Sequence, residues 1–174
     1  WTNVGKAKSY FKGHDQPRVP TELGYYNLKD ASVREEQAKL AREAGIEGFM
    51  YWHYWFGNGK TLMGDIFKEV LSSGKPDFPF CLGWANHSWY SKNWNSDGTS
   101  TNKLLIEQTY PGDDDIKQHY KFLSTAFKDK RYIKVEGKPL FVIYDPNKFP
   151  EHYLKKFQEL AIEDGFPGIF FICY

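Results

Sequence analysis

The chain has little cysteine, no excess of charge of either sign and no long apolar run. Its 174 residues include two cysteines, Cys81 and Cys173, each inside a short apolar segment. Two isolated cysteines cannot form a disulfide framework or a paired zinc site, so we expect buried thiols and a reducing, cytoplasmic setting. Lys and Arg total 23 against 22 Asp and Glu, which argues against a nucleic-acid-binding protein. No apolar run reaches the ~18 residues of a membrane span.

The sequence also lacks the short motifs of several enzyme classes. No Gly-x-Gly-x-x-Gly follows a predicted strand, no phosphate loop ends in Gly-Lys-Ser/Thr, and there is no Gly-x-Ser-x-Gly. His53 and His87 have no carboxylate at a spacing that would complete a metal site with them. These absences give no support to dinucleotide binding, phosphate-loop chemistry or a serine nucleophile.

Aromatic residues, in contrast, are abundant. Trp, Tyr and Phe make up 18% of the chain, and five of the six tryptophans lie between residues 52 and 94. Aromatic side chains fill cores efficiently, so the cluster alone does not identify a ligand site. The position of these rings relative to the strand ends decides whether they belong to the core or to a ligand site.

Hydrophobic periodicity predicts helices and strands in alternation after an irregular segment at residues 1–29. Ser32 and Glu35 form a capping box at the start of the first helix. We expect helices at 32–44, 62–73, 113–127 and 150–164, strands at 48–55, 80–85, 104–106, 140–144 and 168–174, and a polar loop at 86–102. The chain therefore reads as one domain of 1–174, with βα repeats over 30–174.

This alternation predicts an α/β fold with parallel strands, for which two architectures compete. One is a complete doubly wound sheet, and the other is the N-terminal part of a (β/α)8 TIM barrel, an incomplete barrel. No helix follows the last predicted strand and no strand precedes the first helix. Both features favour the barrel fragment.

In either architecture, ligands bind at the carboxyl ends of the strands. Aromatic rings beside amide, imidazole and carboxylate groups at these ends are typical of a sugar site, because rings stack on the sugar and polar groups pair its hydroxyls. The predicted substrate-binding residues are His53, Tyr54, Trp84, Asn86, Trp89, Trp94, Tyr144 and Asp145.

Structural readings compete with the functional ones at several positions. Trp52 and Tyr54 could equally belong to the core, since alternation buries part of each strand, and a lone histidine at a strand end, such as His53, is more often structural than catalytic. His14, His119 and His152 are interpreted as solvated or helix-surface residues. The three aspartates at 113–115 are interpreted as a helix start rather than a metal cluster.

Ten ordered blocks of the sequence follow a recognisable pattern: Trp1–Val4, Phe11–His14, Gln16–Arg18, Leu23–Tyr26, Gly45–Phe49, Tyr51–Phe56, Ser73–Phe80, Trp84–Asn86, Arg131–Ile133 and Gly137–Leu140. These blocks resemble the WbsX-type family of polysaccharide-biosynthesis glycosyltransferases, which is related to glycoside hydrolase family 99. The resemblance implies a (β/α)8 barrel that acts on glycans and needs no cofactor.

The chain departs from the family pattern at two adjacent positions and ends before one block of that pattern. Family members usually continue Trp-Ala-Asn with Glu-Asn-Trp, whereas this chain has His87, Ser88 and Trp89. The family's catalytic carboxylates lie in a later Trp-Asn-Glu-Trp-like block. The resemblance therefore assigns no catalytic residue here, and whether this chain is itself an enzyme stays open.

We expect a glycan-processing protein that binds an oligosaccharide or polysaccharide, as in polysaccharide or lipopolysaccharide biosynthesis. Because the sequence shows no phosphate-binding motif for a nucleotide-sugar donor, we favour hydrolase-like chemistry over glycosyl transfer. The alternative is a non-catalytic carbohydrate-binding domain that uses the same aromatic groove. We expect no nucleic-acid partner and no membrane span, and open strand edges favour self-association.

Overall fold

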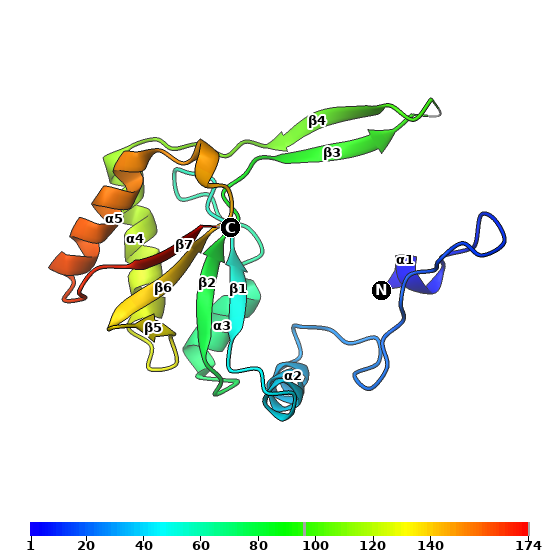
Figure 1. Cartoon of the computed structure of the whole chain (residues 1–174), viewed down its shortest axis with the longest axis horizontal. Coiled ribbons are helices and arrows are strands. Elements are labelled where there is room, and N and C mark those ends of the chain that lie inside the picture. Colours follow the sequence, from blue (N-terminus) through cyan, green and yellow to red (C-terminus); the bar gives the residue numbers. More distant parts are fainter. Residues whose placement is uncertain (96, 174) are drawn as a thin grey trace.

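The computed structural model describes residues 1–95 and 97–173, without the side chains of Lys92 and Trp94. Its centre is a sheet of four parallel strands that lie side by side in chain order (Figure 1): β1 (Phe49–His53), β2 (Phe80–Trp84), β6 (Lys138–Ile143) and β7 (Phe170–Cys173). The short β5 (Lys134–Val135) pairs antiparallel with the start of β6. Since the order of the described parallel strands never reverses, there is no switch point, and the doubly wound alternative is wrong.

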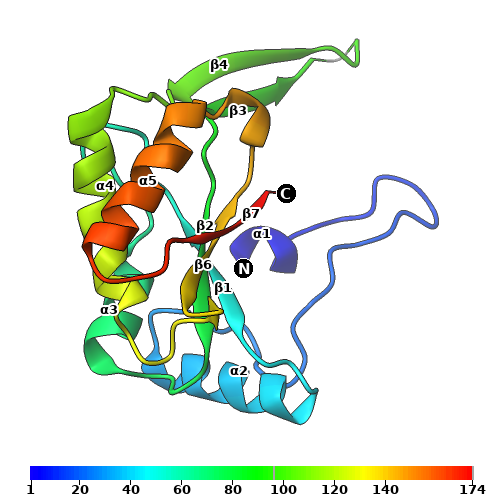
Figure 2. The same cartoon turned by 60° about the vertical axis from the view of Figure 1, so that its left-hand side comes forward.

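Helices cover one face of this sheet (Figure 2). They are α3 (Asp65–Ser73), α4 (Asp113–Phe127) and α5 (Glu151–Glu163), and each connects two parallel strands or leads into one. Helix α2 (Ala31–Glu43) lies beside the amino ends of the strands, and α1 (Thr2–Gly5) is a single turn in the N-terminal segment. The four longer helices confirm the helices that the apolar periodicity predicted.

The start of α2 differs from the predicted capping box. Asp30 is the N-cap, and its carboxylate accepts hydrogen bonds from the backbone N and the hydroxyl of Ser32, at 2.9 and 2.8 Å. The aspartate precedes the first helical residue, whereas Ser32 already has helical backbone, so the aspartate takes the capping role.

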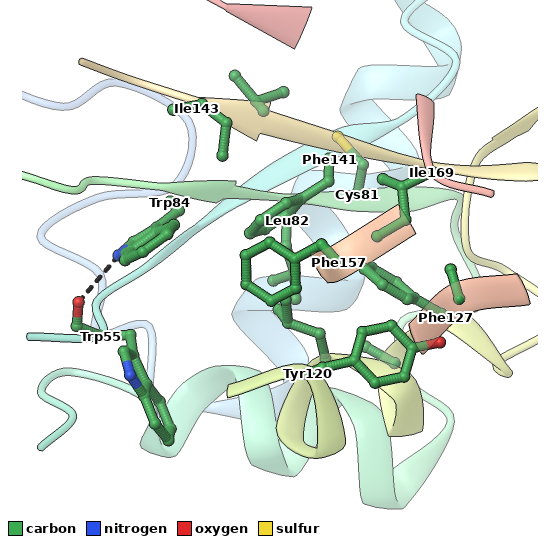
Figure 3. Close-up of a cluster of buried hydrophobic side chains, with 14 of the residues drawn as sticks. Trp55, Cys81, Leu82, Trp84, Tyr120, Phe127, Phe141, Ile143, Phe157 and Ile169 are labelled. Carbon is green, nitrogen blue, oxygen red and sulfur yellow. Dashed lines mark hydrogen bonds between the residues drawn. The ribbon is translucent and has the colours of Figure 1, made fainter. Parts of the chain in front are cut away.

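The core lies between the sheet and the three covering helices (Figure 3). Leu82 and Trp84 of β2 and Phe141 and Ile143 of β6 point to this side and are 0% exposed. The alternate residues point to the other side of the sheet, where Met50 and Trp52 of β1 remain 40% and 42% exposed. One face of the sheet is therefore sealed. On the other, which we call the bare face, Cys81 and Val142 of the central strands are buried, but the outer strands β1 and β7 keep exposed apolar side chains.

Between β2 and α4 the structure has an antiparallel hairpin where a loop was predicted. Strands β3 (Trp89–Trp94) and β4 (Ser100–Ile106) project from the carboxyl edge of the sheet. At the turn, Asp97 accepts a hydrogen bond from the Thr99 backbone N at 2.9 Å, and Gly98 has φ +81°. The prediction of a loop at 86–102 is wrong because polar side chains on both faces hid the strand pattern.

Two further predictions are corrected by burial. Cys173 is exposed, because it lies on the edge strand β7, and only Cys81 is a buried thiol. His119 is 0% exposed in the core side of α4, so its interpretation as a surface residue is wrong. Among the helices of residues 1–95 and 97–173, none has the length and apolar character needed to cross a bilayer.

Candidate functional site

Asn86 joins the carboxyl ends of the two central strands. It follows β2 and is 1% exposed. Its Oδ1 accepts a hydrogen bond from the Asp145 backbone N at 2.8 Å, and its Nδ2 donates to the Asp145 carbonyl at 2.8 Å and to the Tyr110 hydroxyl at 3.1 Å. The predicted Asn86 thus holds the end of β6 against the end of β2 and forms the base of the site.

A hollow of about 400 Å³ lies at this edge. Its lining comes from the end of β2, the two ends of the β3–β4 hairpin, the end of β6 and the turn after it: Asn86, His87, Ser88, Tyr90, Gln108, Tyr110, Tyr144 and Lys148. Aromatic rings and polar groups therefore share one concave surface, which is the usual composition of a small-molecule site.

Aromatic rings form a continuous wall of the hollow. The Tyr144 ring, 39% exposed, lies 5.1 Å from the His87 ring and 5.7 Å from the Trp52 ring, between ring centroids. Trp52 belongs to the bare face of the sheet, so the wall extends from the hollow onto that face. A flat ligand ring could contact Tyr144 from this open side.

Two lining residues keep a buried polar atom without a hydrogen bond among the described residues. They are His87, at Nδ1, and Gln108, at Oε1. The rest of Gln108 is anchored, since its backbone N donates to Ser88 Oγ at 2.9 Å and its Nε2 donates to the Thr109 carbonyl at 3.1 Å. Buried polar groups are normally paired, so these two atoms mark a place that lacks a partner.

The charged groups near the hollow are a lysine and an aspartate. Lys148 Nζ lies 3.4 Å from Asp145 Oδ2, and the Asp145 carboxylate also accepts a hydrogen bond from the Asn147 backbone N at 3.2 Å. Asp145 therefore caps the 3-10 turn η1 (Pro146–Lys148). Among residues 1–95 and 97–173, no three His, Cys, Asp or Glu side chains gather where they could hold a metal ion.

His53 does not join the hollow. It is 6% exposed and points towards α4, where its Nε2 lies 2.7 Å from His119 Nε2 and its ring stacks on Phe122. One nitrogen of this pair carries the hydrogen and the other accepts it. Burial lowers the pKa of His53 to about 3 and that of His119 well below its ordinary value, so both rings are neutral.

Trp84 also lies on the sealed side of the sheet. It is 0% exposed, and its Nε1 donates to the Trp55 carbonyl at 2.9 Å (Figure 3). The Trp55 indole stacks on His119 with ring centroids 4.6 Å apart, and its Nε1 donates to Asp115 at 3.0 Å. His53 and Trp84 thus belong to a buried aromatic and imidazole cluster, and neither enters the site proposed below.

Tyr54 and Trp89 belong to a second aromatic group. The Tyr54 and Trp89 rings meet edge to face at 5.3 Å, and Trp89 also contacts Phe56 at 5.5 Å. Both Tyr54 and Trp89 are half-buried. The backbone of Trp94 belongs to β3, but its side chain lies outside the described residues.

The structure therefore brings Asn86, Tyr144 and Asp145 together and separates His53 and Trp84 from them. The predicted site residues did not include six residues that line the hollow: His87, Ser88, Tyr90, Gln108, Tyr110 and Lys148. Ser88 and Gln108 are brought together by the hairpin, whose register pairs Trp89 with Ile106. Recognising the hairpin in the sequence would have placed both residues at the carboxyl edge.

A family model described as "Glycosyltransferase WbsX" matches residues 1–174. Two curated relatives from Xanthomonas campestris pv. campestris, strains B100 and ATCC 33913, are both named "Uncharacterized protein WxcX" and are 36% identical over 151 residues. The match covers 87% of this chain and 21% of each relative.

A solved structure named "Glycoside hydrolase-like protein" is similar with a TM-score of 0.55 and 16% identity, over 91% of this chain and 47% of that one. At this identity the likeness shows the fold alone. Because the family model matches the chain from end to end, the chain belongs to the family described as Glycosyltransferase WbsX.

Proposed function

We propose that residues 1–174 form the sugar-binding part of a glycan-processing protein, with a sugar ring seated in the hollow at the carboxyl edge of the sheet. The observation behind this proposal is the combination of Tyr144, His87 and Gln108 on one concave surface. The family and the hydrolase-like fold support a glycan-related function at a coarser level.

The chemistry of the hollow suits a sugar. A pyranose has an apolar C–H face, which an exposed tyrosine ring can cover, and hydroxyl groups, which need hydrogen-bond partners once they leave water. Tyr144 offers the ring, while Gln108 and His87 offer polar atoms that have no hydrogen bond to residues 1–95 or 97–173. Asn86 holds the backbone beside His87 to the backbone beside Tyr144, and Ser88 holds the backbone of Gln108.

In this proposal, the chain is the N-terminal part of a (β/α)8 barrel. The sequential strand order and the helices on a single face support this, because right-handed connections between neighbouring strands place every helix on the outside of a barrel. The bare face of Met50 and Trp52 would then line the interior. The chain spans only 21% of the relatives' length, so the activity of the whole protein is part of the proposal.

Hydrolysis and sugar transfer both require acidic groups or a leaving-group site that we do not assign to this chain. We propose that catalytic carboxylates come from a later part of the full-length protein, with hydrolase-like chemistry favoured and a cytoplasmic location. A non-catalytic binding domain is the second candidate. The specific observation for it is His87, which stands where family members usually have a glutamate.

Titration of the full-length protein with a panel of neutral oligosaccharides tests the proposal. Tyr144→Ala is expected to weaken the affinity for the best ligand at least about ten-fold, because truncating an aromatic anchor in a site typically costs more than about 1.4 kcal/mol. Tyr25→Ala is the matched control, since Tyr25 is 59% exposed in the N-terminal segment. Equal affinity of both variants and the wild type would contradict the assignment of the hollow.

A further inference from the structure

The hydrogen bonds of Gln108 determine which end of its side-chain amide is the oxygen and which is the nitrogen. Its Nε2 donates to the Thr109 carbonyl at 3.1 Å, and its backbone is held by Ser88 Oγ at 2.9 Å. Turning the amide over would place Oε1 against the Thr109 carbonyl oxygen, and two acceptors repel each other. Nε2 therefore has a hydrogen-bond partner within the protein, and Oε1 is the other polar atom of the amide.

Oε1 can only accept a hydrogen bond. It is buried from solvent and has no partner among the described residues. A buried acceptor without a hydrogen bond is costly, because it has lost its water and gained nothing in return. Because Gln108 lines the hollow, this unpaired acceptor belongs to a residue of the candidate site rather than to a core residue.

His87 has the same property on the opposite end of the hairpin connection. Its Nδ1 is buried and has no hydrogen bond within the part of the chain that the structure describes, and its ring lies 5.1 Å from that of Tyr144. An imidazole nitrogen can donate or accept, depending on the tautomer. His87 and Gln108 both line the hollow, so one ligand can reach both residues.

Resting on the proposed function, we propose that Gln108 is the residue that determines specificity in this site. Its Oε1 accepts a hydrogen bond from one hydroxyl of a neutral sugar ring, while His87 Nδ1 pairs with a second polar group of the same ring. Both atoms are shielded in this structure, so the proposal requires the two side chains to turn towards the ligand on binding, with the oxygen and nitrogen ends of the Gln108 amide keeping their places.

The acceptor character of Oε1 defines the class of ligand. A hydroxyl can donate to it, whereas a deoxygenated carbon leaves it unpaired and a carboxylate presents another acceptor. Sites built to pair a substrate hydroxyl discriminate strongly against analogues that lack it. The site is therefore expected to select a neutral, fully hydroxylated ring over a deoxy sugar or a uronic acid at this position.

The test uses the full-length protein, methyl glycosides of glucose, galactose and mannose, their monodeoxy derivatives and methyl glucuronide, with affinity measured by calorimetry. For the glycoside that the wild type binds best, loss of one particular hydroxyl is expected to weaken binding at least ten-fold. Gln108→Met, which keeps the length of the side chain but removes the acceptor, is expected to lose that discrimination. Gln118→Met is the matched control, since Gln118 is exposed on α4.

The outcomes separate the inference from the function on which it rests. If the wild type binds a glycoside but Gln108→Met discriminates as well as the wild type, the role of Gln108 is wrong and the sugar site stands. If the wild type binds no glycoside, the proposed function fails and the inference fails with it. Should the variant not fold, the wild-type series decides alone, because tolerance of every monodeoxy derivative within three-fold would overturn the proposal.

Discussion

The imidazoles of His53 and His119 form the least ordinary pair of side chains in the core. Their nitrogens are 2.7 Å apart, and they are enclosed by Trp55, Phe122 and Trp84. Charging either ring would bury an unpaired cation beside a second imidazole, which explains why both pKa values are lowered. The pair thus makes the fold sensitive to pH.

Stability is expected to fall as the pH drops below the ordinary histidine pKa of about 6.5. In that range the unfolded chain takes up protons that the folded chain, with its lowered pKa values, does not. Between pH 7 and pH 5 each buried histidine is expected to lower the free energy of unfolding by about 2 kcal/mol. Urea unfolding at the two pH values measures the difference.

The double variant His53→Leu and His119→Leu should remove most of this dependence, whereas His152→Ala, at an exposed position on α5, should keep it. An unchanged slope in the double variant would show that the pair is not its source.

The hydrogen bonds between Asn86 and the Asp145 backbone are expected to contribute to the stability of the fold. Asn86→Leu leaves the backbone N and carbonyl of Asp145 without their partners, and is expected to lower the free energy of unfolding by about 2–4 kcal/mol. The midpoint of urea unfolding measures this. Asn147→Ala, at an exposed position two residues beyond Asp145, is the control and should change the midpoint little.

The burial of His119 could have been predicted from the sequence, but its pairing with His53 could not. His119 lies three residues after Ile116 and four before Leu123, so it shares their buried stripe on α4. The prediction treated it as a polar surface residue, because residue type was given more weight than position. That His119 pairs with His53 could not be predicted, since it depends on how α4 crosses the end of β1.

Among the elements, the long helices and the parallel strands were predictable because their apolar periodicity is clear. The β3–β4 hairpin was not, since its strands have polar residues on both faces and lie away from the core. Its omission also hid half of the candidate site. Only the pairing of Trp89 with Ile106 places Ser88 beside Gln108 and creates that side of the hollow.

Helix α3 offers a prediction at the scale of the element. It ends at Gly74, which has φ +72° and open space where a Cβ would stand. Gly74→Ala is therefore expected to cost about 1 kcal/mol through backbone strain alone. Thermal unfolding measures it, and Gly5→Ala, with open space and no left-handed backbone, should be close to neutral. Equal stability of the two variants would refute a strain effect at the end of α3.

At the scale of the whole molecule, the sheet is covered on one face and bare on the other. Trp52 of β1 and Phe170 and Ile172 of β7 are 42%, 39% and 41% exposed. Strands β1 and β7 each have a neighbour on one side only among the described strands. Exposed apolar surface next to unpaired strand edges promotes association.

A sample of residues 1–174 alone is accordingly expected to associate as its concentration rises, which light scattering would detect as an increasing mass. Ile172→Lys places a charge on the bare face and should reduce the association. Ile162→Lys places the same charge at a 61% exposed position on α5 and should not. A constant monomer mass at all concentrations would contradict the expectation.

The bonding of Asn86 separates two roles at position 145. The Asn86 amide pairs with the main-chain atoms of Asp145, whereas the Asp145 carboxylate caps the turn η1. A substitution at position 145 therefore removes the cap of η1 but leaves in place the two bonds that join the ends of β2 and β6.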